Sequence, residues 1–118
     1  MAEASKKYSG AGLPIKIADE AFGHYESKEF TVANAQTDYD MKTQVTDAFS
    51  TVKRAHGIII RTDQSISVKL NATGSDSITL TSTEAQLVVG QEMRMEITNI
   101  FITNASGSTA NVKILLFP

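Results

Sequence analysis

The chain of 118 residues has no cysteine and no tryptophan, and only two prolines and two histidines. Without cysteine, disulfides and thiolate metal sites are excluded. No apolar run approaches the roughly 20 residues of a membrane-spanning helix, and the first residues lack the apolar stretch of a secretory signal. We therefore expect a protein that is made and folded in a cytoplasm and has no membrane partner.

The charges are few and nearly balanced. Eleven basic and thirteen acidic side chains give a formal net charge of −2 at pH 7. Basic residues adjoin one another only as the pairs Lys6-Lys7 and Lys53-Arg54. Nucleic-acid-binding domains usually carry a basic face or stripe. The sequence therefore predicts no nucleic-acid partner.

Residues with catalytic or metal-binding chemistry are sparse. Neither His24 nor His56 has metal-ligand spacing to another His, Asp or Glu. Asp38 and Asp40 would share one face of a strand and could approach a hard cation, but a solvated face is the favoured interpretation because further ligands are not evident. No glycine-rich phosphate-binding motif is present. We predict a non-enzymatic protein with no catalytic residue, no cofactor and no metal.

The length is typical of one domain. Residues 1–13 are small, polar and glycine-bearing, and we expect them to form a flexible N-terminal arm. Residues 14–118 then make a single domain, and residues 13–17 alternate in a way that suits an edge strand, where Pro14 is tolerated.

Most of this domain reads as short β-strands. Apolar and polar residues alternate in blocks, and clusters of Asn, Gly, Ser, Asp and Thr separate the blocks at short spacing. Blocks of this kind lie at residues 28–33, 39–45, 58–60, 66–70, 77–81, 86–89, 93–103 and 110–117. The pattern predicts an all-β fold, an antiparallel β-sandwich or a barrel.

One segment changes its period and predicts the one short α-helix, over about residues 46–56. Spacings of three, four and seven relate Val45, Ala48, Phe49, Val52 and Ala55. Thr46 is a suitable N-cap and Gly57 a suitable residue beyond the C-terminus. We expect this helix to close one end of a barrel or to pack against a sheet.

Two strands carry more apolar residues than one buried face requires. In 93–103 the alternation changes phase between Ile97 and Ile100, which predicts a β-bulge near Thr98-Asn99 or burial on both sides. In 110–117, Leu115 and Phe117 are apolar on the face opposite Val112, Ile114 and Leu116. The last strand should therefore be central in its sheet or covered by another subunit.

From this surplus we predict a subunit interface. It would contain Leu115 and Phe117 together with one of two pairs, Ile100 and Ile102 or Met93 and Met95. Closed oligomers also remove exposed sheet edges, which are aggregation hazards.

The C-terminal hairpin carries a resemblance. The strand from Ile97, the loop Asn104-Ala105-Ser106-Gly107 and the strand ending at Phe117 resemble the closing hairpin of small tailed-bacteriophage virion proteins. The resemblance extends over roughly residues 28–117. It implies a capsid decoration (cement) jelly roll or another small head or tail component. It also implies a homo-oligomer, a trimer before other rings, that binds the major capsid protein or other virion proteins and resides in the virion. No functional residue is carried over.

An alternative is a carbohydrate- or receptor-binding β-sandwich module on a viral appendage. The serine and threonine faces, with Ser65, Ser67, Thr79 and Thr81 among them, could bind a sugar. Sugar sites usually add aromatic platforms, and here they would have to come from a loop cluster around Tyr25 and Tyr39. The sequons at Asn71 and Asn104 lie in expected hairpin loops, where turn chemistry explains them.

Overall fold

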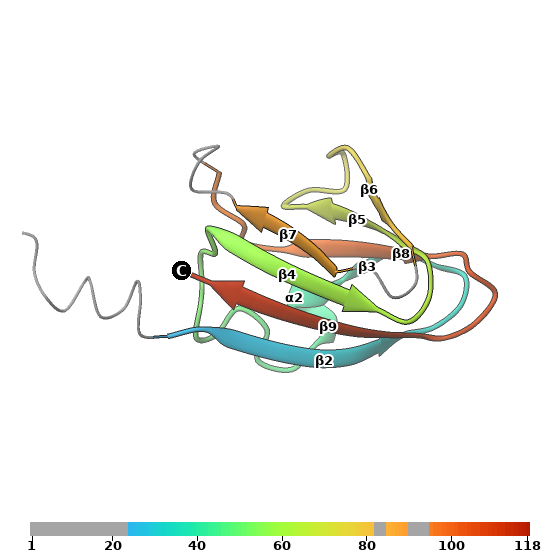
Figure 1. The fold of residues 1–118 in the computed structure, drawn as a ribbon, viewed down its shortest axis with the longest axis horizontal. Coiled ribbons are helices and arrows are strands. Elements are labelled where there is room, and N and C mark those ends of the chain that lie inside the picture. Colours follow the sequence, from blue (N-terminus) through green and yellow to red (C-terminus); the bar gives the residue numbers. More distant parts are fainter. Residues whose placement is uncertain (1–23, 82–84, 90–94) are drawn as a thin grey trace, which may run out of the picture.

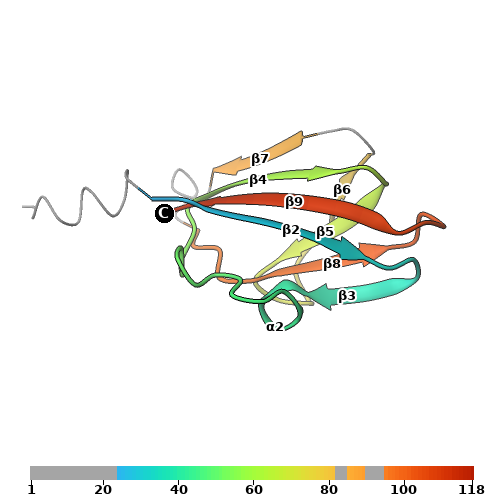
Figure 2. The same ribbon diagram turned by 90° about the horizontal axis from the view of Figure 1, so that it is seen from below.

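The computed structural model describes residues 24–81, 85–89 and 95–118, and these form two four-stranded antiparallel sheets packed face to face (Figures 1 and 2). The first sheet has the order β2 (Glu26–Val32), β9 (Ala110–Phe117), β4 (Gly57–Thr62), β7 (Ala85–Val89). The second has the order β3 (Gln36–Asp40), β8 (Ile100–Asn104), β5 (Ile66–Leu70), β6 (Ile78–Leu80). The predicted all-β sandwich is confirmed.

The pairing of the strands follows a simple rule. Taking the described strands in chain order, the first pairs with the last, β2 with β9, and the second with the seventh, β3 with β8. The third and sixth, β4 and β7, and the central β5 and β6 complete the series. The chain is thus a long hairpin rolled across two sheets, which is the jelly-roll arrangement.

The core lies between the sheets and comes from alternate strand residues. In β9 the buried set is Val112, Ile114 and Leu116, and in β5 it includes Ile66 and Val68. Burial of each such side chain stabilises the fold by roughly 1.5–3 kcal/mol. Since β9 lies between β2 and β4, the last strand is central, one of the two solutions that its sequence allowed.

The described helix is not the predicted one. α2 covers only Met41–Gln44, whereas residues 46–56 form turns and bends, so the predicted helix over 46–56 is wrong. Positive φ angles at Asp47 (59°) and Phe49 (57°) are incompatible with a helix there. No described helix is long and apolar enough to cross a membrane.

A buried carboxylate explains why the 46–56 segment is a loop. The Glu26 side chain, 4% exposed, points from β2 into the sandwich and accepts three backbone N–H groups. Phe49 N donates to Oε2 at 2.7 Å, and Thr51 N and Val52 N donate to Oε1 at 2.7 and 2.9 Å. These N–H groups bind the carboxylate and are therefore not used in the hydrogen bonds of a helix. The apolar residues of the segment, Phe49, Val52 and Ala55, are buried all the same.

The predicted strand 39–45 is wrong beyond Asp40, because β3 covers Gln36–Asp40 and residues 41–44 form α2. β3 ends at Asp40, whose Oδ1 accepts the backbone N–H of Lys42 at 3.1 Å and so caps α2. Met41 then turns fully into the core. Phe30 on β2 and Tyr39 on β3 stack on each other, with their ring centroids 6.0 Å apart and an angle of 11° between the ring planes.

The change of phase in 93–103 marks a strand boundary. β8 begins only at Ile100, and Ile97 forms an isolated bridge with Ala55. Ile97 and Ile100 are both fully buried because the irregular residues between them reset the alternation. The bulge predicted near Thr98-Asn99 is therefore wrong, and the irregular register lies in β3, between Gln36 and Tyr39. The predicted arm 1–13 and edge strand 13–17 lie outside the described residues.

We predict that removing the Glu26 carboxylate is costly. Glu26→Ala leaves three backbone donors without their acceptor and should lower the free energy of unfolding by about 3 kcal/mol or more, and Glu26→Gln by about 1–3 kcal/mol. Chemical denaturation measures both changes.

The matched control lies on the same strand. Glu29→Gln alters an exposed carboxylate and should change stability by less than about 1 kcal/mol. Equal losses at positions 26 and 29 would show that the Glu26 hydrogen bonds do not hold the loop.

Candidate interaction surface

The outer face of the first sheet is built around β9. Because β9 is central and its alternate residues enter the core, the remaining residues point away from the second sheet. They are Asn111, Lys113, Leu115 and Phe117, of which the first pair is exposed and the second pair half-buried. Along this strand the outer face therefore changes from polar to apolar.

The apolar part of this face gathers residues from β9, from β4 and from the segment just before β2. Leu115 lies opposite Ser27 on β2 and opposite half-buried Ile59 on β4. Phe117 lies opposite Gly57. Tyr25, immediately before β2, is 62% exposed, the most exposed large hydrophobic residue described. We call Tyr25, Ile59, Leu115 and Phe117 the apolar band.

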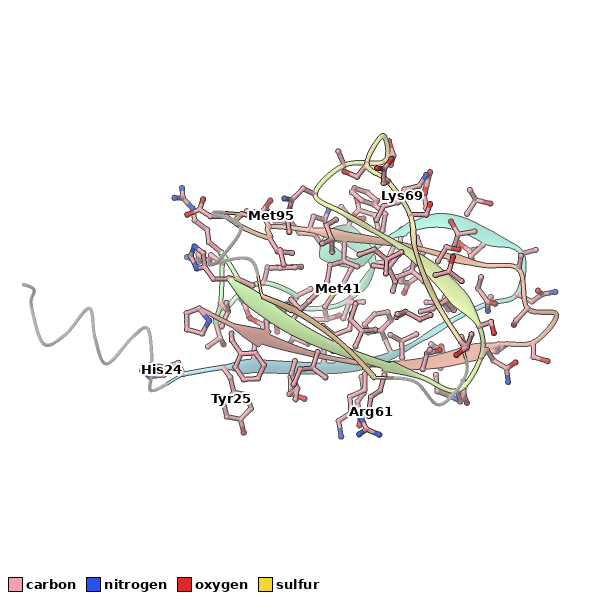
Figure 3. The ribbon with its side chains drawn as sticks, turned by 45° about the horizontal axis from the view of Figure 1, so that its top comes forward. His24, Tyr25, Met41, Arg61, Lys69 and Met95 are labelled. Carbon is pink, nitrogen blue, oxygen red and sulfur yellow. The ribbon has the colours of Figure 1, made fainter. Side chains whose placement is uncertain are left out.

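The next row along the strands is charged. Lys113 lies opposite Glu29 on β2 and Arg61 on β4, and its Nζ is 3.2 Å from Glu29 Oε2. Both side chains are more than half exposed, so the pair contributes at most about 1 kcal/mol to stability. Arg61 has no ion-pair partner within the described ranges. Figure 3 shows Arg61 and Tyr25 projecting from the same side of the molecule.

Beyond the charged row an aspartate is held by an asparagine. Asn111 donates its side-chain Nδ2–H to Asp63 Oδ2 at 2.6 Å and its backbone N–H to Oδ1 at 2.8 Å. The side-chain bond first, and then the backbone bond, lower the pKa of Asp63 below its ordinary value of 3.8. An open groove of about 630 Å³ runs over this polar part, lined by Glu29, Arg61, Asp63 and Lys113 among others.

The predicted interface residues separate into two groups. Leu115 and Phe117 lie on the outer face, in the apolar band. Ile100 and Ile102 are 0% exposed and belong to the core, so their surplus apolar surface is used between the sheets and we no longer place them in a subunit contact. Met95 is half-buried against the core, and Met93 lies outside the described residues.

The outer face of the second sheet has a different character. Ser67 on β5 lies opposite Thr79 on β6 and Thr103 on β8, which makes a row of hydroxyl groups. A shallow depression of about 210 Å³ covers this row. Beside it, Lys69 Nζ lies 3.3 Å from Asp38 Oδ1, an oxygen that makes no hydrogen bond and so has the ammonium as its electrostatic partner.

The aromatic residues suggested for a sugar site do not gather near these hydroxyls. Tyr39 packs against the core and stacks on Phe30, and Tyr25 lies on the other sheet's side. Asp38 and Asp40, weighed as a cation pair, have separate partners: Lys69 for the first, and Lys42 N and Asn99 Nδ2 for the second. Nowhere in the described ranges do three His, Asp or Glu side chains gather in a way that could hold a metal ion.

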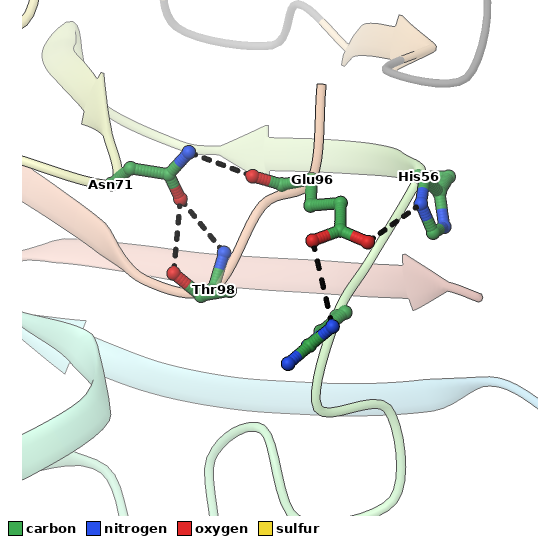
Figure 4. A network of polar contacts seen from close by, with 5 residues as sticks. His56, Asn71, Glu96 and Thr98 are labelled. Carbon is green, nitrogen blue, oxygen red and sulfur yellow. Dashed lines mark hydrogen bonds and ion pairs between the residues drawn. The ribbon is translucent and has the colours of Figure 1, made fainter. Parts of the chain in front are cut away.

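His56 belongs to a polar network that ties together distant segments (Figure 4). Its Nε2 lies 3.6 Å from Glu96 Oε2, and Arg54 Nη1 lies 3.8 Å from Glu96 Oε1. Asn71 Nδ2 donates to Glu96 O at 2.7 Å, and Asn71 Oδ1 accepts Thr98 N at 2.7 Å. The network holds the segment before β8 against neighbouring loops, while His24 is exposed at the start of the described chain.

Asn104, in the second sequon, is a structural residue. It is 0% exposed, and its Nδ2 donates to Val32 O at 2.9 Å and to Ser108 O at 2.8 Å. The amide therefore fastens the β8–β9 hairpin to the end of β2.

Comparisons with protein-family models, with curated proteins and with solved structures found no match. The role of these surfaces therefore has to be inferred from their own geometry and chemistry.

We predict that Asp63 titrates below 3.8 in the folded protein and that Asn111→Ala moves its pKa back up, because the strongest hydrogen bond to the carboxylate is lost. Carboxyl NMR titration measures both values. A depressed folded-state pKa means that this contribution to stability is present above the unfolded pKa and disappears as pH falls through the folded pKa.

Thr31→Ala is the control for this titration, since Thr31 lies opposite Asn111 on β2 but gives Asp63 no hydrogen bond. An ordinary pKa for Asp63 in the unmodified chain would contradict the proposed pairing.

Proposed function

We propose that the chain is a non-enzymatic structural protein of a tailed-bacteriophage particle. It is a capsid decoration (cement) protein or another small head or tail component, located in the virion after synthesis in the host cytoplasm. It acts by self-association and by binding a protein lattice, with the major capsid protein or another virion protein as partner. The observation that carries this proposal is the apolar band on the outer face of the first sheet.

The apolar band supports adhesion because its place in the fold makes it rigid. Leu115 and Phe117 project from β9, which is hydrogen-bonded to β2 on one side and β4 on the other. A face on a doubly bonded strand keeps its shape when a partner binds, so little ordering entropy is lost. Each Å² of apolar area covered by a partner contributes about 25 cal/mol.

The strand order gives further support. A jelly roll of two four-stranded sheets is the architecture of many viral capsid domains, and also of lectin domains and cupins. This is an analogy at the level of the fold, and a fold does not assign a function by itself. The polar groups of the face favour a structural role, because Asp63 is bound by Asn111 and Glu29 by Lys113.

One observation favours the second candidate, a carbohydrate- or receptor-binding module. The hydroxyl row of Ser67, Thr79 and Thr103 lies in a shallow depression and could hydrogen-bond sugar hydroxyls. No aromatic residue is among the described residues that line the depression, and Phe101, opposite Lys69 in the neighbouring row, is half-buried. A glycan array separates the candidates, since only this module should give saturable binding that Ser67→Ala weakens.

The test of the structural role is whether the chain belongs to a particle. Phage particles from cells that encode the chain should carry it through a density gradient, in fixed proportion to the main shell protein, as detected by an antibody against the chain. The chain should remain with particles after a high-salt wash, because apolar contacts are not screened by salt.

The same antibody provides the control. Free chain run without particles should stay at the top of the gradient, whereas chain added to particles that lack it should move with them. Chain found only in the soluble cell fraction, with none on particles, would contradict the structural role.

A further inference from the structure

We propose that the outer face of the first sheet binds a second copy of this chain, in a face-to-face dimer whose two-fold axis runs along β9. The inference deepens the self-association part of the proposed function and rests on it. It is carried by how the rows of this face complement one another. It also predicts a two-fold contact in place of the trimer that the resemblance implied.

The rows follow from the strand registers. One row across β2, β9 and β4 is Ser27, Leu115 and Ile59, and the next is Glu29, Lys113 and Arg61. Continuing the β2 register by one residue places Tyr25 beside Phe117, which faces Gly57 on β4. In each row β9 lies in the middle, with β2 and β4 as the two flanks.

A two-fold axis along β9 exchanges the two flanks. It puts β9 over the partner's β9 and β2 over the partner's β4, while every row stays over the same row. The strands of the two faces then run nearly parallel to one another, which is the aligned mode in which twisted sheets pack, within about 30°. The contact can therefore form without bending either sheet.

In this arrangement the charged rows attract. Glu29 comes to lie over the partner's Arg61, and Arg61 over the partner's Glu29. Arg61 has no ion-pair partner among the described residues of a single chain. In the dimer each of the two Arg61 side chains gains such a partner. Lys113 faces the partner's Lys113 on the axis, but each ammonium keeps its own Glu29 carboxylate at 3.2 Å.

The apolar rows complement each other in shape. Leu115 meets the partner's Leu115 on the axis, and Ile59 lies over the partner's Ser27. Tyr25, 62% exposed in the single chain, comes over the partner's Gly57, a position with no side chain. The largest projecting side chain therefore meets the lowest point of the facing row.

A two-fold axis across the strands would lack this match. It would place β2 over the partner's β2, and would bring Glu29 toward the partner's Glu29 wherever the charged rows overlapped. Like charges facing each other across an interface disfavour that orientation. The charges on the face therefore favour the axis along β9 over an axis across the strands that passes through the charged row.

The experiment measures the solution mass of the full chain by light scattering and sedimentation over a range of concentrations. The unmodified chain should be a dimer, and Leu115→Glu should dissociate it. Glu29→Arg and Arg61→Glu should each weaken dimerisation about tenfold, since attraction becomes repulsion at two places in the dimer. The double exchange E29R/R61E should restore it.

The rescue by the double exchange is specific to this geometry. Within one chain Lys113 lies between positions 29 and 61, so the exchange preserves the balance of charges around it. Thr79→Glu, a change at an exposed position on the outer face of the second sheet, is the control and should leave the mass unchanged. Unfolding curves of every variant exclude misfolding as the cause of a lost dimer.

Each other outcome overturns the proposal in a recognisable way. A trimer would reject the two-fold contact but keep self-association, and hence the proposed function. A monomer at all concentrations would reject the dimer and the self-association part of the proposed function, and the particle test would then decide the lattice-binding part by itself. If Leu115→Glu leaves the dimer intact, or if the double exchange fails to restore it, the dimer uses a different surface and the proposal is rejected.

Discussion

The fold depends on the last strand taking its place between the first two strands of its sheet. β9 is hydrogen-bonded to β2 along seven residue pairs and to β4 along six, and it contributes Ile114 and Leu116 to the core. The paired residues are fifty or more positions apart along the chain, so the sheet closes only after β9 has been made. Long-range pairing of this kind makes for slow folding and leaves edges open until it is complete. Once in place, the strand is stiff and presents its other face outward.

A buried charge directs the path of the longest described loop. Glu26 occupies an inward position of β2, where an unpaired carboxylate would cost several kcal/mol. The backbone N–H groups of Phe49, Thr51 and Val52 provide the compensation, and they can do so only if that segment is not helical. The interaction thus satisfies a charge and shapes a loop at the same time. It also brings Phe49 and Val52 into the core from a segment without regular structure.

The two outer faces of the sandwich suit different kinds of contact. The first sheet presents the apolar band beside a row of one acidic and two basic side chains, whereas the second presents hydroxyl groups around Ser67. Apolar side chains on a rigid strand favour a protein partner, and charges in register can choose its orientation. Short hydroxyl side chains bind weakly by themselves but keep a sheet face hydrated. This difference between the two outer faces is the feature of the molecule that bears most directly on its function.

Alternation by itself determined the β class of the chain, the inward residues of strands such as β5 and β9, and the outward placement of Leu115 and Phe117, because side chains on a strand alternate regardless of its neighbours. Only the tertiary structure decided which strands are paired, and hence that β9 is central. It also decided that residues 46–56 form a loop, because apolar spacing reports burial and does not specify the backbone conformation that achieves it. The local pattern predicts Ile100 and Ile102 at a surface for a related reason. Their strand begins after an irregular segment that resets the alternation, and that boundary arises from contacts with Ala55 and Asn71, both distant in the chain. The local pattern thus indicates which residues become buried, while long-range hydrogen bonds determine where in the fold they lie.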